Sequence, residues 1–414
     1  MAGCDLRALW SRPAAIPELH HNGYRKDIPS AARGNAVFTG AQFSDDGALI
    51  VTTHHNDPKM RVWDAKTGKL ISSFTASPAD DVWMIDAGHR RFVGRTHGNP
   101  NLVVFDLMSG RIVSEIPDRS ENRAFPLGLT DDDTAVVLAK PGMIEVWNLV
   151  PPTLIRSAEN PLPVDAYRPA CVGGVPATYN DKKCWELSPG KRWLAMAFTP
   201  VPSVGASSIF YLIDLQTLMM RQLVLPDGQT GKNVSAFAFS ADERVLAFGT
   251  DRGVWFYEIS SNRWGPFVAG DHRRNAYLGA MRFSDDGKRL VTLGDQLQTS
   301  VFDTTTGSRL GRMEPAEWDR EGVFRVSRDG SRIVIYHFVS DVLEVLDAQN
   351  AQRIGWVCPY FCNLKHNPVE VPYAVSPDGK AVAASQRAGS GVWETDTDRL
   401  LFPLNDPSMP PLKD

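Results

Sequence analysis

The stretch from Ala41 to Phe74 constrains the fold most strongly, because the rest of the chain repeats its pattern. It contains four short apolar runs, which end at Phe43, Thr53, Asp64 and Phe74 and are separated by polar residues and Gly. Apolar runs of this length, bounded by Gly and Asp turns, predict four antiparallel β-strands. One such sheet cannot bury both of its faces alone, so the chain must stack several copies of it.

Eight copies of this unit can be recognised by the residues that end the predicted third strand. Each marker is two apolar or aromatic residues followed by Asp, Glu or Asn, and successive markers are 42, 42, 66, 44, 45, 44 and 47 residues apart. A four-stranded unit that repeats about every 40–45 residues is typical of a β-propeller blade. The markers are Val62-Trp63-Asp64, Val104-Phe105-Asp106, Val146-Trp147-Asn148, Leu212-Ile213-Asp214, Phe256-Tyr257-Glu258, Val301-Phe302-Asp303, Val345-Leu346-Asp347 and Val392-Trp393-Glu394.

A second repeated signal lies in phase with the first, in the turn after each predicted first strand. This turn reads Ser-Asp-Asp-Gly at residues 284–287, related turns follow Val326 and Val375, and degenerate versions follow Leu129 and Phe239. The 66-residue step contains an insertion, residues 159–183, which holds four prolines. Because it is too short for a blade and prolines disfavour a central strand, we expect it to be an inserted loop.

The two signals resemble those of the WD-repeat and YVTN-type β-propeller families over residues 35–404. The Gly-His pair that WD repeats carry before the first strand is absent from almost every unit, and Gly270-Asp271-His272 comes nearest to it. The chain is therefore more similar to a divergent, bacterial branch. The resemblance implies an all-β fold, a single propeller of four-stranded antiparallel blades, with eight blades favoured and seven as the alternative. It also implies a non-enzymatic scaffold that binds protein partners without a cofactor.

The chain divides into an N-terminal arm (1–34), a WD-like propeller (35–404, with the loop 159–183 inserted) and a C-terminal tail (405–414). We expect the arm to cover the seam between the first and last blades, and the tail to be frayed. The net charge of −4 gives no reason to expect a nucleic-acid-binding face. No apolar run approaches the roughly 20 residues that span a bilayer. The sequence predicts a monomeric, cytoplasmic ring.

The strand order predicts which face of the ring binds a partner. In an up-and-down blade, the loops between the second and third strands and the loops between blades lie on one face, and the long loops of this chain belong to that set. Binding residues concentrate on long loops, and Trp, Tyr and Arg often anchor protein interfaces. For Trp318 and Phe361, packing onto the ring as loop core is the alternative. The candidate partner-binding residues are Arg273, Arg274, Trp318, Arg320, Tyr360, Phe361 and His366.

A metal-binding or hydrolytic propeller, similar to the lactonases, is one alternative function. His54, His55, His97 and His337 fall at or just beyond the ends of predicted second strands in the first, second and seventh units. These units adjoin around the seam of an eight-bladed ring, and converging histidines bind metals such as zinc or copper. No paired-ligand motif accompanies them, and histidines at strand ends also pack between blades.

An envelope lipoprotein scaffold is the other alternative function. Cys171 and Cys184 flank one loop and Cys358 and Cys362 bracket another, so two local disulfides are possible in an oxidising compartment. Cys4 follows Ala-Gly, as at the end of a bacterial lipoprotein signal, which would anchor the protein in the periplasm. The other interpretation is five reduced thiols in a cytosolic protein. Both interpretations stay open from the sequence.

Overall fold

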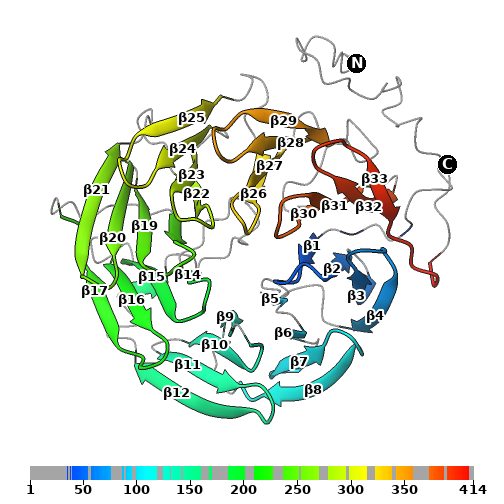
Figure 1. The fold of residues 1–414 in the computed structure, drawn as a ribbon. Coiled ribbons are helices and arrows are strands. Elements are labelled where there is room, and N and C mark those ends of the chain that lie inside the picture. Colours follow the sequence, from blue (N-terminus) through cyan, green and yellow to red (C-terminus); the bar gives the residue numbers. More distant parts are fainter. Residues whose placement is uncertain are drawn as a thin grey trace.

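The computed structural model describes residues 35, 38, 40–54, 57–75, 86–87, 90–95, 99–118, 125–130, 132–140, 143–159, 167–169, 185–200, 209–226, 236–250, 253–269, 278–294, 298–314, 322–337, 342–357, 373–386 and 389–409. These residues form eight antiparallel sheets arranged in a ring, and the prediction of a single eight-bladed propeller is confirmed. Figure 1 shows the blades in sequence order around the ring, with first strands innermost and last strands outermost.

The first four blades contain strands β1 to β17. Blade 1 contains β1 (Gly40–Phe43), β2 (Leu49–His54), β3 (Asp57–Asp64) and β4 (Leu70–Thr75). Blade 2 contains β5 (Asp86–Ala87), β6 (Arg91–Arg95), β7 (Leu102–Asp106) and β8 (Arg111–Ile116). Blade 3 contains β9 (Phe125–Leu129), β10 (Ala135–Lys140), β11 (Met143–Asn148) and β12 (Thr153–Glu159). Blade 4 contains β13 (Tyr167–Pro169), β14 (Trp185–Leu187), β15 (Trp193–Pro200), β16 (Ile209–Asp214) and β17 (Met220–Leu223).

The other four blades contain strands β18 to β33. Blade 5 contains β18 (Ala236–Phe239), β19 (Val245–Thr250), β20 (Gly253–Glu258) and β21 (Arg263–Ala269). Blade 6 contains β22 (Leu278–Phe283), β23 (Arg289–Gly294), β24 (Thr299–Asp303) and β25 (Arg309–Met313). Blade 7 contains β26 (Gly322–Val326), β27 (Arg332–His337), β28 (Val342–Asp347) and β29 (Arg353–Val357). Blade 8 contains β30 (Tyr373–Val375), β31 (Ala381–Gln386), β32 (Gly389–Glu394) and β33 (Leu400–Pro403).

Blade 4 differs from the others because its innermost position is occupied by two short strands. β14 pairs with one half of β15, and β13 pairs with the other half, Phe198 to Pro200. β13 belongs to the segment that we expected to form only a loop, so three residues of that segment form a strand instead. Its Pro169 is tolerated because β13 is an edge strand, where a missing backbone N–H donor breaks no ladder on the open side.

The apolar core lies between blades and not within them. The described side chains form eight apolar clusters, one at each boundary between neighbouring blades. Alternation along each strand divides its side chains between two clusters: on β23, Leu290 packs toward blade 5 and Val291 toward blade 7. Every blade therefore depends on both of its neighbours for burial.

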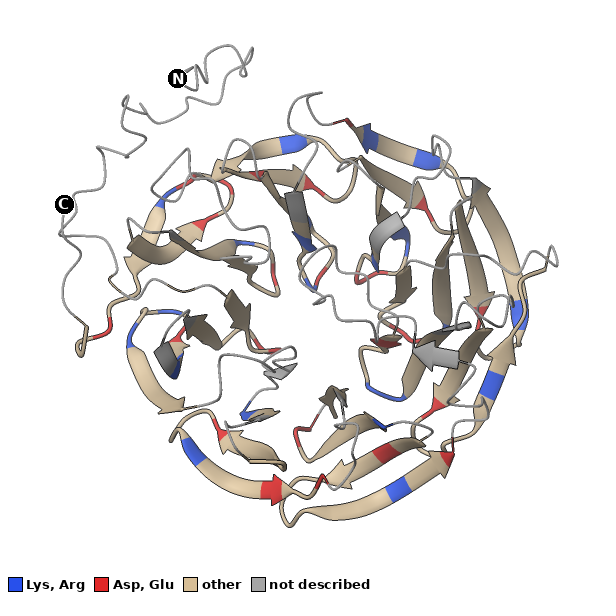
Figure 2. Ribbon diagram, turned by 180° about the vertical axis from the view of Figure 1, so that it is seen from behind, with Lys and Arg blue, Asp and Glu red and all other residues tan. Residues whose placement is uncertain are grey.

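The described residues form no helix, so they contain no helix long and apolar enough to cross a membrane. Figure 2 shows the ring from behind, with Lys and Arg interspersed with Asp and Glu along the strands and turns.

The ring closes between blade 8 and blade 1 without exchange of a strand, because β33 pairs with β32 of its own blade as expected. Phe38, Phe43 and Trp63 pack there against blade 8 residues such as Val392. Phe38 is 2% exposed, and its N–H donates to Ser385 Oγ at 2.8 Å.

The first residues of the C-terminal tail complete this closure. Asn35 Nδ2 donates to the carbonyl oxygens of Asp406 and Met409, both at 3.0 Å, and the Asp406 N–H donates to Asn35 Oδ1 at 2.7 Å. The Arg61 Nε atom lies 2.5 Å from Asp406 Oδ2, and both side chains are almost fully buried. The prediction of a frayed tail is therefore wrong for residues 405–409, because Asp406 supplies the counter-charge of a buried arginine. Residues 1–34, expected to cover the seam, lie outside the described residues.

Replacement of Asp406 by Ala is expected to destabilise the protein by about 3 kcal/mol, because it removes one partner of a buried ion pair and its hydrogen bond to Arg61 Nε. Equilibrium unfolding in urea measures this difference. The matched control is Asp396→Ala, which removes the interblade partner of Arg332, a carboxylate that is 46% exposed. It is expected to cost less than about 1 kcal/mol. Equal losses of unfolding free energy in the two variants would contradict the assignment of the Arg61–Asp406 pair as a contact that closes the ring.

Candidate functional site

The carboxylates of the repeated turns accept hydrogen bonds from residues of the same turns. In the first turn of blade 1, which joins its first and second strands, Ser44 Oγ donates to Asp46 Oδ1 at 2.6 Å, and the Ala48 N–H donates to the same oxygen at 2.9 Å. The same bonds recur in the first turns of other blades, between the pairs Thr130 and Asp132, Ser240 and Asp242, Ser284 and Asp286, Ser327 and Asp329, and Ser376 and Asp378.

The third turns, between the third and fourth strands, use the carboxylate that ends each marker. Asp64 Oδ1 accepts hydrogen bonds from the Thr67 N–H and hydroxyl at 2.8 and 2.9 Å, and Asp303 Oδ1 binds Thr306 in the same way. The Thr67 hydroxyl lowers the pKa of Asp64, and the Thr306 N–H lowers that of Asp303. These carboxylates recur because the turns recur, and they act as acceptors in the fold.

In blades 1, 3, 5, 7 and 8 the fourth residue of the first turn contacts the preceding blade. In these blades and in blades 4 and 6 it has a positive φ angle, and in blades 1, 6, 7 and 8 it is glycine. A Cβ atom on Gly330 would lie 2.5 Å from the Ser284 Cα atom of blade 6. Where the residue is acidic, its carboxylate reaches the preceding blade: Asp133 accepts from the Arg90 N–H at 2.5 Å, and Glu243 accepts from the Gly190 N–H at 2.7 Å. The first turns therefore interlock from blade to blade.

Replacement of Gly330 by Ala is expected to destabilise the protein clearly more than replacement of Gly287 by Ala. Both glycines have a φ of 66°, so both alanines carry the left-handed strain of roughly 1–2 kcal/mol. Only the Gly330 variant also drives a Cβ atom into the neighbouring blade, since nothing lies within 4 Å of the Cβ position at Gly287. Thermal unfolding of the two variants compares them. Equal shifts of Tm would contradict the interlocking of the turns.

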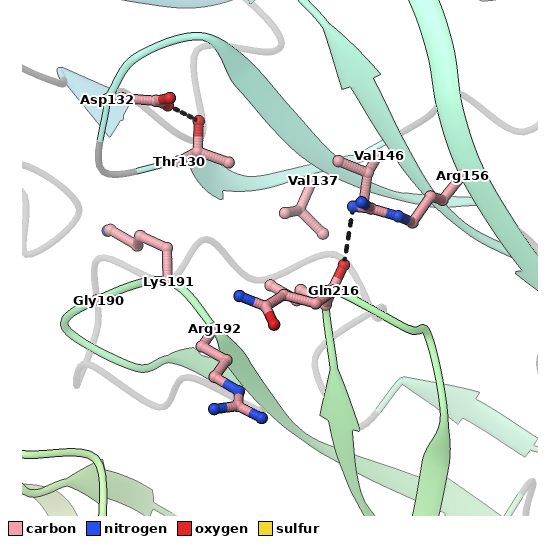
Figure 3. Close-up of a pocket in the computed structure, with 10 residues that line it drawn as sticks. Thr130, Asp132, Val137, Val146, Arg156, Gly190, Lys191, Arg192 and Gln216 are labelled. Carbon is pink, nitrogen blue, oxygen red and sulfur yellow. Dashed lines mark hydrogen bonds between the residues drawn. The ribbon is translucent and has the colours of Figure 1, made fainter.

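The first turn of blade 4 departs from this pattern. It reads Ser188-Pro189-Gly190-Lys191, so glycine stands where the other turns have the capping Asp, and lysine stands at the position that faces the preceding blade. Lys191 has a φ of 55°. A pocket of about 400 Å³ lies at this point between blades 3 and 4. Figure 3 shows it, with the turn of blade 3 on one side and the Gly190–Arg192 segment on the other.

The pocket combines buried apolar residues with charged residues around them. Val137, Val146 and Leu215 belong to the cluster between blades 3 and 4 and are at most 5% exposed. Arg156 on β12 lies in register with Val146, which pairs with Val137 on β10, so the three side chains form one row across the sheet. The remaining lining residues are Thr130, Asp132, Gly190, Lys191, Arg192 and Gln216.

The three cationic side chains that line the pocket differ in the partners that they contact. Arg192 lies 3.4 Å from the Asp214 carboxylate and stacks over the Trp193 ring at 5.0 Å. Arg156 donates to the Leu215 carbonyl at 3.4 Å. Within the described part of the chain, neither Arg156 nor Lys191 has a carboxylate within salt-bridge distance. The Thr130 hydroxyl donates to Asp132 and lowers the pKa of this carboxyl, so it is ionised at neutral pH.

Most of the residues predicted from the sequence lie outside the described residues. These are the partner-binding candidates Arg273, Arg274, Trp318, Arg320, Tyr360, Phe361 and His366, the cysteines Cys4, Cys171, Cys184, Cys358 and Cys362, and His55 and His97. His54 ends β2, but its side chain is not among those described. The described residues contain no group of three or more His, Cys, Asp or Glu side chains that could hold a metal ion. The predicted sites on these loops stay predictions.

His337 is the one candidate histidine whose side chain is described. It is 2% exposed, and its Nε2 atom lies 2.9 Å from Glu344 Oε2. The other oxygen of Glu344 accepts from Arg353 Nε at 2.5 Å, and Arg353 lies over the Trp356 ring at 4.6 Å. Burial by itself raises the pKa of Glu344, but His337 and Arg353 outweigh it and leave this pKa below its usual value of 4.5. The group links β27, β28 and β29 within blade 7.

The pKa of Glu344 predicts a pH-dependent contribution to stability. Because this pKa is lowered in the folded state, the contribution is complete above the usual value of 4.5 and is lost as the pH falls through the folded value. The Glu344→Gln variant is expected to be less stable than the wild type at pH 7, with a smaller difference near pH 3. Urea midpoints at both pH values measure this. A difference that is independent of pH would contradict it, and the exposed Glu159→Gln variant serves as the control.

Exposed apolar side chains gather on the outer edge of three consecutive blades. Eleven large apolar side chains in the described part of the chain are more than a third exposed. Eight of them lie on or beside the outer strands β8, β12 and β17, which follow one another along the edge of the ring in Figure 1. We call them the rim patch: Met108, Ile112, Val113, Val150, Leu154, Ile155, Met219 and Val224.

The sequence contained partial signals for the rim patch and for the pocket, but neither feature was predicted from them. Adjacent apolar residues in fourth strands, Ile112-Val113 and Leu154-Ile155, break the alternation expected of a strand with one wet face. The Gly190-Lys191 pair breaks the turn repeat. Neither signal says which residues of other strands lie beside these positions.

The sequence was compared with protein-family models and with curated proteins, and nothing matches it. The fold is similar to those of solved propeller structures. The computationally designed Ika8 protein has a TM-score of 0.59 at 15% identity, over 87% of this chain and 97% of its own. Hsv2 from Kluyveromyces marxianus has a TM-score of 0.52 at 14% identity (75% and 92%), and Hsv2 from Kluyveromyces lactis one of 0.51 at 12% (79% and 98%). At these identities the likeness shows the fold alone.

Proposed function

We propose that the protein is a non-enzymatic scaffold that binds a protein partner, and that the rim patch is part of the binding surface. The concentration of exposed apolar side chains on blades 2, 3 and 4 carries this proposal. Soluble proteins rarely leave large apolar patches uncovered, and such patches commonly mark interaction sites. The likeness to other propellers is compatible with this role, since a rigid ring presents its surface without rearrangement.

The strand β12 gives this surface a second feature. All but one of its seven residues are exposed, and as an outer strand it has one edge without a β-partner in its sheet. Exposed strand edges favour pairing with another chain, and apolar side chains next to them strengthen it. The long-loop residues predicted from the sequence, Arg273, Arg274 and Trp318 among them, remain proposed contacts of a second surface, as the sequence predicts.

A rim variant with Ile112→Thr, Leu154→Thr and Ile155→Thr is expected to weaken partner binding by at least about tenfold, because it removes apolar contact area while keeping residues that favour strands. The partner is identified by affinity capture from the native cell and mass spectrometry. Its affinity for purified wild-type and variant protein is then measured by calorimetry.

The matched control carries Leu310→Thr and Leu401→Thr, which remove exposed apolar side chains from the outer edges of blades 6 and 8. It is expected to bind as the wild type does. A third variant, with Arg273→Ala, Arg274→Ala and Trp318→Ala, tests the long-loop face. If only this third variant loses the partner, the rim patch is not the binding surface. If no variant changes an affinity that is measurable in the wild type, both surfaces are rejected.

A further inference from the structure

The outer strand β12 presents the longest and most exposed strand edge among the eight blades. Natural sheets protect their edges with short strands, proline, lysine and bulges, and glycine weakens a strand. The outer strands β21, β25, β29 and β33 contain glycine or proline, and β17 has four residues. β12 has seven residues without glycine, proline or lysine, and six of them are exposed. The six-residue strands β4 and β8 have two and four exposed residues.

The backbone of β12 is regular over its last four residues. A bulge lies near its start, where the register with β11 shifts between Val146 and Trp147. From Arg156 to Glu159, every residue pairs with one residue of β11. In the described sheets β12 pairs with β11 alone, and Figure 1 shows it at the outer margin of the ring. Alternate residues of this run therefore direct their N–H and C=O groups away from β11, where an added strand can pair with them.

The side chains of β12 point to two different sides of the sheet. Arg156 pairs with Val146, which packs in the cluster toward blade 4. Leu154 pairs with Trp147, which packs against the cluster toward blade 2. Side chains of an added strand alternate in the same way, and they contact the residues opposite them on their own side. One set therefore lies beside Arg156, and the other lies on the side of Leu154.

Arg156 determines which charge is favoured opposite it. Its side chain is exposed, and it donates one long hydrogen bond, to the Leu215 carbonyl at 3.4 Å. Other arginines of outer strands, such as Arg312, Arg353 and Arg399, have a carboxylate partner within their own blade. Opposite charges across neighbouring strands attract and like charges repel. An acidic residue is therefore favoured opposite Arg156, and a basic residue is disfavoured.

We infer that the partner adds an extended segment to the free edge of β12, with an acidic residue opposite Arg156 and apolar residues on the side of Leu154. Main-chain hydrogen bonds to the edge supply affinity in this mode of recognition, and the alternating side chains supply selectivity. The inference rests on the proposed function, because it states how the rim patch receives its partner.

The test uses a fluorescently labelled heptapeptide with blocked ends, Thr-Thr-Val-Glu-Val-Thr-Thr, and the same peptide with Lys in place of Glu. Fluorescence anisotropy measures their binding to the full chain. The Glu peptide is expected to bind at least about threefold more tightly than the Lys peptide. A peptide with Pro in place of both Val residues keeps the acid but cannot complete the ladder, and it is expected to bind at least about tenfold more weakly.

Two results with the wild type would overturn the inference. One is the absence of Glu-peptide binding at up to about 1 mM protein. The other is an equal affinity for the Glu and Lys peptides.

A charge reversal assigns the binding to β12. The Arg156→Glu variant is expected to prefer the Lys peptide over the Glu peptide, because the opposing charges then attract in the reverse combination. The control Arg263→Glu changes an exposed arginine of β21, whose edge is interrupted by Gly265 and Pro266. It is expected to keep the wild-type preference. An unchanged preference in Arg156→Glu contradicts the assignment to β12.

Hydrogen exchange separates edge pairing from contact through side chains alone. Saturation with the Glu peptide is expected to slow amide exchange in Thr153–Glu159 at least about threefold and to leave Arg263–Ala269 unchanged, because only a paired edge protects backbone N–H groups. Unaltered exchange in Thr153–Glu159 under saturating peptide is incompatible with a strand added to β12.

The outcomes also distinguish this inference from the proposed function. If the rim variant weakens binding of the captured partner but the wild type binds no heptapeptide, the proposed function stands and the edge pairing is wrong. If the Glu peptide binds through Arg156 but the rim variant binds the partner normally, the edge pairing stands and the apolar side chains are not the contact. A wild-type protein that sediments as a dimer and binds no heptapeptide points to a second copy at this edge, which overturns the inference.

Discussion

The burial of both faces of every sheet by its two neighbours is the constraint on which the structure depends. A four-stranded sheet such as blade 6 sends Leu290 to one side and Val291 to the other, and neither cluster exists without the adjacent blade. A row of such sheets leaves two apolar faces open at its ends, and only closure into a ring removes them. The boundary between blades 8 and 1 is therefore where the covalent chain helps least. There Asn35, Phe38 and Asp406 add polar and apolar contacts to the packing of the sheets.

The first turns share one pattern in most blades and depart from it in blade 4. In the regular turns, a serine or threonine, an Asp and a residue with positive φ satisfy the local backbone and contact the preceding blade. These side chains are hydrogen-bonded within the fold, so they are poorly placed to bind a ligand. Blade 4 replaces the Asp-Gly pattern by Gly190-Lys191, and the contact gives way to a pocket. Function is expected at positions where the sequence breaks a local rule of the fold without a structural gain.

The rim patch and the pocket lie on the same part of the ring, since β12 carries Leu154, Ile155 and Arg156 in succession. They differ in chemistry. The rim patch offers apolar area along the outer edges of three blades, which suits a protein surface, whereas the pocket combines charged residues with a small apolar base. A rigid propeller can present both without rearrangement, because its blades are held by buried clusters on each side.

The sequence by itself determined the fold class and the chemistry of the turns and favoured eight blades over seven, because alternation, period and the placement of Gly or Asp are local patterns in the order of the residues. The tertiary structure alone decided the candidate site. Arg61 meets Asp406 across almost the whole chain, and Arg156 and Lys191 line one pocket across an insertion, so no spacing predicts either arrangement. The residues chosen from loop length, such as Trp318 and Arg273, lie outside the described residues. Loop length indicates where a chain has freedom, but contacts between blades decide which side chains share a site.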